Sequence, residues 1–138
     1  ESAGHTFTVL DAAMNDLLRP SLYDAHHAIV PVRESAADTD FHPTDIVGPI
    51  CESGDVFAHG RPMPPLATDD LLVIRTAGAY GAVMSSNYNS RPLAAEVLVN
   101  GDIFEIVRRH QTNEEMLALE EMPSWFDDHN VSRTRGVA

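Results

Sequence analysis

The chain has 138 residues, enough for about one domain of ordinary size. Its charge is lopsided: 21 acidic residues stand against nine basic ones, the net charge is −12, and every basic residue is an arginine. Without a lysine, this segment supplies neither a P-loop lysine nor a Schiff-base lysine. Without a basic patch or a basic helix, it is not expected to bind nucleic acid or an anionic membrane.

The apolar residues occur in short runs. The longest uninterrupted aliphatic run covers residues 71–74, far short of the ~20 apolar residues that a membrane helix needs. No basic region followed by an apolar stretch opens the chain, so we expect no secretory signal. Because the first residue is Glu1 and not Met, we expect a piece of a longer protein. A single cysteine, Cys51, fits a reducing compartment and a cytoplasmic location.

Most of the predicted elements are short strands. Runs of β-branched, aliphatic and aromatic residues between turn residues indicate strands over 7–10, 27–33, 44–51, 56–58, 70–75, 94–99 and 102–108. A continuation of the fifth strand is expected over 82–86. Polar or proline-rich stretches predict loops over 34–43, 60–68 and 87–92.

Two short helices are predicted. Arg19-Pro20 is typical of a helix start, because proline suits the first helical position, and it predicts a helix near 21–26. Thr112-Asn-Glu-Glu115 is a capping box that opens a helix over 113–121, which ends before Pro123.

The clearest local signal is Asn100-Gly101 between the last two strands. Both residues tolerate a positive φ, so the pair predicts a type I′ hairpin. Seven or eight short strands with two small helices indicate a mainly β domain, a barrel or a sandwich. We expect this domain to span residues 1–112, a C-terminal helix to span 113–122, and the tail over 123–138 to be flexible.

The first candidate site is the stretch Gly48-Pro-Ile-Cys51-Glu52-Ser53-Gly54-Asp55. A lone cysteine is more often buried filler, but this one ends a predicted strand beside an acid, and sites are often built there. A free thiol is mostly protonated near neutral pH, so Cys51 can serve as a general acid. In a regular strand Cys51 and Glu52 point to opposite faces. Both reach one site only if the backbone bends at Ser53-Gly54.

Three other clusters are candidates, each with a plainer alternative. Arg19 and Tyr23 share a helix face, where they form a carboxylate clamp or simply a surface arginine stacked on a tyrosine. Tyr80 lies between two glycines, either at a site or in the core at a glycine-rich turn. The polar stretch 86–92 either binds an anion or ties down its own backbone.

The histidines do not form a metal-binding pattern. They stand at His5, His26, His27, His42, His59, His110 and His129. Because no His-x-His or Glu-x-x-His spacing occurs, no metal site is expected.

Four stretches together resemble the C-terminal half of the diaminopimelate decarboxylase family. They are FTVLDAAMNDLLRPSLYD from Phe7, VGPICESGD from Val47, GAYGAVMSSNYNSRP from Gly78 and AEVLV from Ala95. The resemblance spans about residues 7–121, and CESGD is its most specific part.

This resemblance implies a fold-type III enzyme that uses pyridoxal phosphate, with an N-terminal β/α barrel and a C-terminal β-domain of modified Greek-key type. The present chain is similar to the β-domain. In the family the cofactor lysine, the glycine-rich phosphate site and a further substrate arginine lie in the barrel, outside this sequence. The resemblance therefore implies that this segment alone is inactive.

The resemblance also implies roles for individual residues. Cys51 would be the acid that protonates Cα after CO₂ leaves. Glu52 would hold the ammonium at the far end of the substrate, Arg19 and Tyr23 would hold the carboxylate there, and Tyr80 would contact substrate and cofactor. In the family the positions of Cys51 and Glu52 reach into the partner subunit's site, which implies a homodimer.

The distal clamp favours meso-diaminopimelate, and hence L-lysine as product. Ornithine has a distal ammonium but no distal carboxylate, so it would leave Arg19 and Tyr23 unpaired, which is unfavourable in a buried site. Two alternatives stay open at this point. One is a related ornithine, arginine or carboxynorspermidine decarboxylase. The other is a β-module that binds a partner and catalyses nothing, which the absent barrel and lysine would suit.

Overall fold

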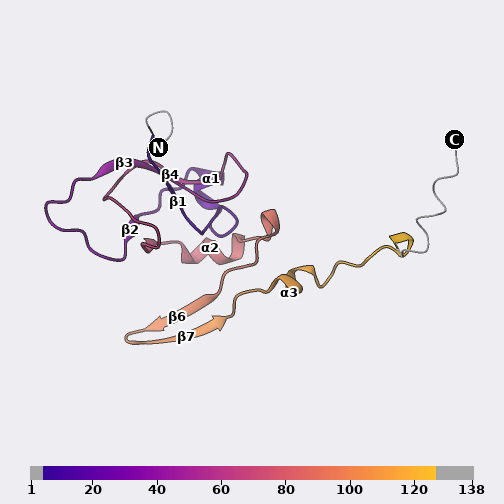
Figure 1. The fold of residues 1–138 in the computed structure, drawn as a ribbon. Helices are drawn as coiled ribbons and strands as arrows, with labels where there is room; N and C mark the ends of the chain where they lie inside the picture. The colour runs from indigo at the N-terminus through magenta and orange to yellow at the C-terminus, as the bar shows by residue number, and fades with distance from the viewer. Residues whose placement is uncertain (1–4, 127–138) are drawn as a thin grey trace, which may run out of the picture.

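The structure is a computed structural model that describes residues 5–126. Strands dominate it, which confirms the mainly β class (Figure 1). The strands are β1 (Phe7–Val9), β2 (Ile29–Pro31), β3 (His42–Val47), β4 (Val56–Met63), β5 (Leu72–Ile74), β6 (Glu96–Asn100) and β7 (Ile103–Arg108). The helices are α1 (Arg19–Tyr23), α2 (Gly78–Met84) and α3 (Asn113–Leu117), with 3-10 turns η1 (Tyr88–Ser90) and η2 (Ser124–Phe126). In the part of the chain described, no helix is both long and apolar enough to traverse a membrane.

The strands pair in three small sheets. In the first, β3 lies between β1, to which it is parallel, and β4, to which it is antiparallel. The second sheet pairs β2 with β5, and the third is the hairpin of β6 and β7. Across residues 5–126 these sheets do not close into a barrel. Figure 1 shows the hairpin and α3 lying outside the cluster that the other elements form.

The hydrophobic core joins the first two sheets. Its buried members come from β2, β3, β4 and the segment before α1, and they are Leu17, Ile29, Ile46, Phe57, Ala58 and Met63. By contrast, the apolar side chains of the hairpin face water on both sides of the strands. Those of Leu98, Ile103 and Phe104 are each more than 60% exposed. The core therefore fixes the end of the molecule that carries the candidate residues, while the hairpin contributes little to it.

The strand predicted over 44–51 begins and ends earlier, so Cys51 lies in a loop and not at the end of a strand. The strand ends at Val47, and the N–H of Gly48 makes one more bond in the same register, to the carbonyl of Asp55 at 2.9 Å, before the chain enters the loop. β4 in turn runs to Met63, although 60–68 was predicted as a loop. Gly60 adopts φ +53 and donates its N–H to Asp45 Oδ1 at 2.7 Å, and this irregularity lets pairing resume beyond it.

A helix, α2, occupies the position where a strand continuation was predicted over 82–86. Alanine and methionine favour helix, and Gly81 is the buried residue of this helix, on the side that faces Leu17. α1 is also displaced from the predicted 21–26. It ends at Tyr23 because Asp24 takes a left-handed conformation with φ 52.

The hairpin forms as predicted, but with another turn. Asn100 pairs with Ile103, so the turn residues are Gly101 and Asp102, and only Gly101 has a positive φ (+62). A type I′ turn needs positive φ at both central residues, whereas glycine at the first position suits type II′.

The capping box of Thr112 is confirmed, but α3 stops at Leu117 and not near 121, because it buries none of its residues. The rest of the predicted tail, after Phe126, lies outside the described residues.

Candidate functional site

A buried carboxylate shapes residues 48–55, which we call the 48–55 loop. The side chain of Asp55 is 3% exposed. Its Oδ2 accepts the N–H of Ile50 at 3.0 Å, and its Oδ1 accepts the N–H of Met14 at 2.7 Å. Hydrogen bonds to an ionised acceptor are among the stronger ones in proteins. Asp55 therefore closes the loop and ties it to the segment that leads into α1.

The same carboxylate explains why residue 48 is glycine. A Cβ built on Gly48 would lie 2.1 Å from Asp55 Oδ2 and 2.5 Å from Asp55 Cγ. No side chain fits at these distances, so the loop needs glycine for close approach. Both residues stand within the motif that carries Cys51, but no pattern in the sequence indicates that they are in contact.

The backbone bends next to Cys51, and such a bend is needed if Cys51 and Glu52 are to reach the same site. The N–H of Glu52 bonds the carbonyl of Ile50 at 2.8 Å, and that of Asp55 bonds the carbonyl of Glu52 at 3.0 Å. Cys51 and Glu52 are both exposed on this turn. A thiol and a carboxylate are thus presented to solvent from adjacent positions of one hydrogen-bonded loop.

Both oxygens of the Glu52 carboxylate accept hydrogen bonds. Oε1 accepts the N–H of Gly54 at 3.2 Å, and Oε2 accepts the hydroxyl of Tyr88 at 3.1 Å. These bonds, that from Gly54 first, lower the pKa of Glu52, and the carboxylate in turn raises the pKa of Tyr88. From the sequence Tyr88 is only part of the polar stretch 86–92, and no spacing indicates its contact with Glu52.

Arg19 contacts a tyrosine other than the one predicted. Its guanidinium carbon lies 5.7 Å from the centre of the Tyr80 ring, within cation–π range. Tyr23 is 63% exposed, and among residues 5–126 no hydrogen bond joins it to Arg19. The structure thus brings together Arg19 of α1 and Tyr80 of α2, with Tyr23 one turn further along α1.

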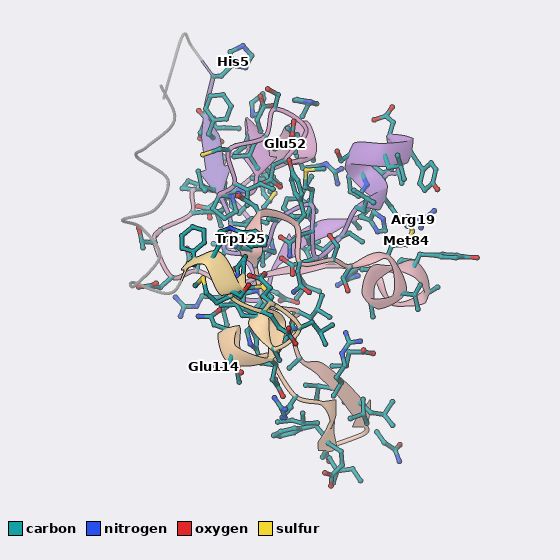
Figure 2. The ribbon with its side chains drawn as sticks, turned by 90° about the vertical axis from the view of Figure 1, so that its right-hand side faces the viewer. His5, Arg19, Glu52, Met84, Glu114 and Trp125 are labelled. Atoms are coloured by element: carbon teal, nitrogen blue, oxygen red, sulfur yellow. The ribbon has the colours of Figure 1, made fainter. Side chains whose placement is uncertain are left out.

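The two parts of the candidate site face different regions of the surface. In Figure 2, Arg19 and Met84 are both drawn toward one side of the molecule, and Glu52 lies apart from both. The 48–55 loop nevertheless touches α1, because a Cβ on Gly54 would lie 3.0 Å from Ser21 Oγ. Since Cys51, Glu52, Tyr23 and Tyr80 are all exposed, residues 5–126 do not themselves enclose a site.

A groove of about 550 Å³ lies between α1 and β4. Its lining includes Ser21, Asp24, Ser53 and Arg61. None of the predicted catalytic or binding side chains lines it, so the groove adjoins the candidate site without containing it.

Polar side chains of the stretch 86–92 bond to the protein's own backbone, which is the second of the two alternatives given above for this stretch. Asn87 Nδ2 donates to the carbonyl of Arg91 at 2.8 Å. The guanidinium of Arg91 donates to the carbonyl of Asp11 and lies 3.8 Å from Asp16 Oδ2. These donors are therefore directed at the protein itself and not at an open anion site.

The candidate residues offer no obvious metal centre. His5 and His59 each approach Asp45, at 3.6 Å and 3.7 Å. No group of three or more side chains in the described part of the chain is arranged to hold a metal ion.

Comparisons with known proteins identify relatives of both the sequence and the fold. Residues 1–78 match the sequence model of a family described as the C-terminal sheet domain of pyridoxal-dependent decarboxylase. The diaminopimelate decarboxylase of Zymomonas mobilis is 50% identical over 126 residues, which cover 91% of this chain and 29% of the relative. That of Archaeoglobus fulgidus is 41% identical over 87% of this chain and 28% of the relative.

Solved structures agree with these relatives. The crystal structure of diaminopimelate decarboxylase from M. jannaschii with L-lysine superposes with a TM-score of 0.83 at 32% identity, over 89% of this chain and 28% of that one. The lysine/ornithine decarboxylase of Vibrio vulnificus with cadaverine gives a TM-score of 0.57 at 26% identity, over 65% of this chain and 24% of that one. The present chain spans less than a third of the length of each of these proteins.

Proposed function

Because the chain belongs to the family of the pyridoxal-dependent decarboxylase C-terminal sheet domain, we propose that its full-length protein converts meso-diaminopimelate to L-lysine and CO₂. The observation that carries the proposal is the 48–55 loop, which presents Cys51 and Glu52 together on one fixed turn. Relatives named diaminopimelate decarboxylase that align over most of this chain support it. A cytoplasmic location is part of the same proposal.

Cys51 is the proposed acid. When CO₂ leaves, the bond between Cα and the carboxylate breaks, and Cα needs a proton in its place. A protonated thiol on a fixed loop can donate that proton from its Sγ. The exposure of Cys51 supports this role, because a thiol sealed in the core could not reach a substrate.

Pyridoxal phosphate supplies an electron sink for the decarboxylation when it is bound. This chain lacks a lysine to hold it, so the covalent anchor belongs to the rest of the protein. We propose that Tyr80 contacts the cofactor. Tyr80 is 57% exposed, and the guanidinium of Arg19 lies over its ring. An exposed aromatic ring that carries a hydroxyl fits such a contact.

Arg19 and Glu52 are proposed to bind the two groups on the distal carbon of the substrate. The guanidinium of Arg19 pairs with the carboxylate, assisted by Tyr23, and the carboxylate of Glu52 pairs with the ammonium. These side chains must converge on one carbon, yet they lie apart on this chain (Figure 2). Two copies that complete each other's sites would resolve this separation, so we include a homodimer in the proposal.

The N-terminal β/α barrel is the other proposed partner. The relatives are more than three times as long as the present chain, so most of each lies outside the region matched here. The exposed candidate side chains would pack against that part. The same arrangement implies that the 138-residue chain alone does not decarboxylate any amino acid.

The substrate is tested on the full-length protein by measuring CO₂ release from meso-diaminopimelate and from ornithine. We expect a clear preference for meso-diaminopimelate, because ornithine leaves the Arg19 guanidinium without its carboxylate. A preference for ornithine would contradict the proposal and favour the related decarboxylases. Release of CO₂ from neither substrate would favour a non-catalytic binding module.

The role of Cys51 is tested by Cys51→Ala and Cys51→Ser in the full-length protein. We expect kcat to fall about a hundredfold or more in both variants, in line with the usual contribution of a positioned general acid. The absorbance of bound pyridoxal phosphate should stay unchanged, which controls for folding and for cofactor binding. Unchanged turnover in either variant would remove the acid role from Cys51.

A further inference from the structure

The Glu52 carboxylate is held from two directions that are independent in the sequence. The N–H of Gly54 belongs to the same turn and bonds Oε1 at 3.2 Å. The Tyr88 hydroxyl comes from η1, 36 residues later, and bonds Oε2 at 3.1 Å. A second element of the fold therefore reaches across to a side chain that the proposed function uses for substrate binding.

The stretch that carries Tyr88 is itself well anchored. The N–H of Tyr88 bonds Ser86 Oγ at 3.3 Å, and Asn87 Nδ2 bonds the carbonyl of Arg91 at 2.8 Å. Asn89 and Ser90 adopt left-handed backbone conformations, with φ of 58 and 56, which bend the chain sharply after Tyr88. The backbone that carries Tyr88 is thus held by hydrogen bonds within its own stretch.

The hydrogen bonds leave Glu52 able to bind a cation. An ionised carboxylate has about four lone-pair directions, and Gly54 and Tyr88 use two of them. The Ser53 backbone also donates to this carboxylate. The remaining direction points to solvent and can accept one of the three donors of an ammonium. Without the hydroxyl, an exposed glutamate samples several rotamers, and binding a ligand must then fix them at an entropic cost.

We propose that Tyr88 is a positioning residue for recognition of the distal ammonium: it orients the Glu52 carboxylate without touching the substrate. This inference rests on the proposed function, in which Glu52 binds that ammonium. It predicts that Tyr88 affects substrate affinity more than turnover, because the reacting bond lies at the other end of the substrate.

The test uses Tyr88→Phe in the full-length holoenzyme, with Ser90→Ala as a matched control. The control removes a hydroxyl from the same 3-10 turn, and in the part of the chain that the structure covers the Ser90 side chain has no hydrogen-bond partner. For Tyr88→Phe we expect KM to rise about three- to tenfold, the usual range for one partly exposed hydrogen bond, with kcat within about twofold. We expect Ser90→Ala to match the wild type.

Two further readouts separate positioning from a general structural effect. The hydrogen bond lowers the pKa of Glu52, so its loss should move the acid limb of kcat/KM to higher pH. In a Glu52→Gln background, Tyr88→Phe should cause no further rise in KM, because the two residues act through one another. An unchanged KM and pH profile in Tyr88→Phe would overturn the inference, as would equal effects with and without Glu52.

The design also distinguishes failure of this inference from failure of the proposed function. Ornithine carries a distal ammonium as well, so the effect of Tyr88→Phe on KM can be measured with whichever substrate the enzyme prefers. A preference for ornithine together with a Tyr88 effect would refute the proposed substrate and support the positioning role. A preference for meso-diaminopimelate without a Tyr88 effect would do the reverse.

Discussion

Replacement of Gly48 by alanine tests how the 48–55 loop is built. The added Cβ would lie 2.1 Å from Asp55 Oδ2, 2.4 Å from Oδ1 and 2.5 Å from Cγ. Because all three atoms are too close, rotation of the carboxylate does not relieve the clash. Either Asp55 leaves its buried position or the loop backbone moves away from it.

The expected loss of stability follows from the bonds that Asp55 makes. Displacement breaks its hydrogen bonds with the N–H groups of Met14 and Ile50. Hydrogen bonds to a charged group contribute about 1.5–3 kcal/mol each, so two of them set an upper limit of about 3–6 kcal/mol. Movement of the partly exposed loop lowers this value, and we expect Gly48→Ala to reduce the free energy of unfolding by about 2–4 kcal/mol.

The assay is the thermal unfolding midpoint of the full-length protein. The relatives are more than three times as long as this chain, and the entropy of unfolding grows with length, so we expect a drop of about 2–4 °C for Gly48→Ala. Gly78→Ala is the control, because a Cβ at Gly78 meets no atom within 4 Å; we expect its Tm to match or slightly exceed the wild type. In an Asp55→Ala background the clash is gone, so Gly48→Ala should change Tm little further. Equal drops in both backgrounds would refute the reasoning.

Two further predictions concern other parts of the chain. Thr112→Ala removes one half of the capping box and should destabilise α3 by about 1 kcal/mol, measured by amide hydrogen exchange of α3. The pKa of Glu115 is lowered to about 2, chiefly by its hydrogen bond with Arg109. The ionised Glu115 should therefore stabilise α3 fully above the ordinary pKa near 4.5, and this stabilisation should disappear as the pH falls toward 2. Hydrogen-exchange protection of α3 that does not change in acid would contradict this prediction. In the full-length enzyme, Arg19→Lys keeps the positive charge but loses the planar guanidinium, so we expect KM for meso-diaminopimelate to rise about tenfold or more. Tyr80→Phe keeps the ring under Arg19 and should leave the orientation of Arg19 intact. Equal KM values for Arg19→Lys and the wild type would contradict the proposed carboxylate clamp.

Local signals in the sequence identified the features that depend on neighbouring residues. The capping box of Thr112 and Glu115 forms across three residues and was predicted correctly. The hairpin around Gly101 was also predicted, although its turn is displaced by one residue. In both cases the partners are so close in sequence that their chemistry alone fixes the geometry.

The contacts that build the candidate site could not be predicted in the same way. Asp55 reaches Met14 across 41 residues, and Tyr88 reaches Glu52 across 36. Arg19 was expected to act with Tyr23 on its own helix, but tertiary packing places it against Tyr80 of α2. The second part of that helix was predicted as a strand continuation over 82–86 and its first part as a glycine-rich turn, because two glycines and a valine obscure the helical preference of its alanines and methionine.

The hairpin of β6 and β7 has a consequence for any work on this chain in isolation. Leu98, Ile103 and Phe104 lie open to water on strands that, within residues 5–126, no third strand supports. A two-stranded ribbon is marginally stable by itself, and such side chains tend to associate with whatever apolar surface is nearby. The melting point of the 138-residue chain alone would therefore vary with its concentration, and it would report self-association as much as folding.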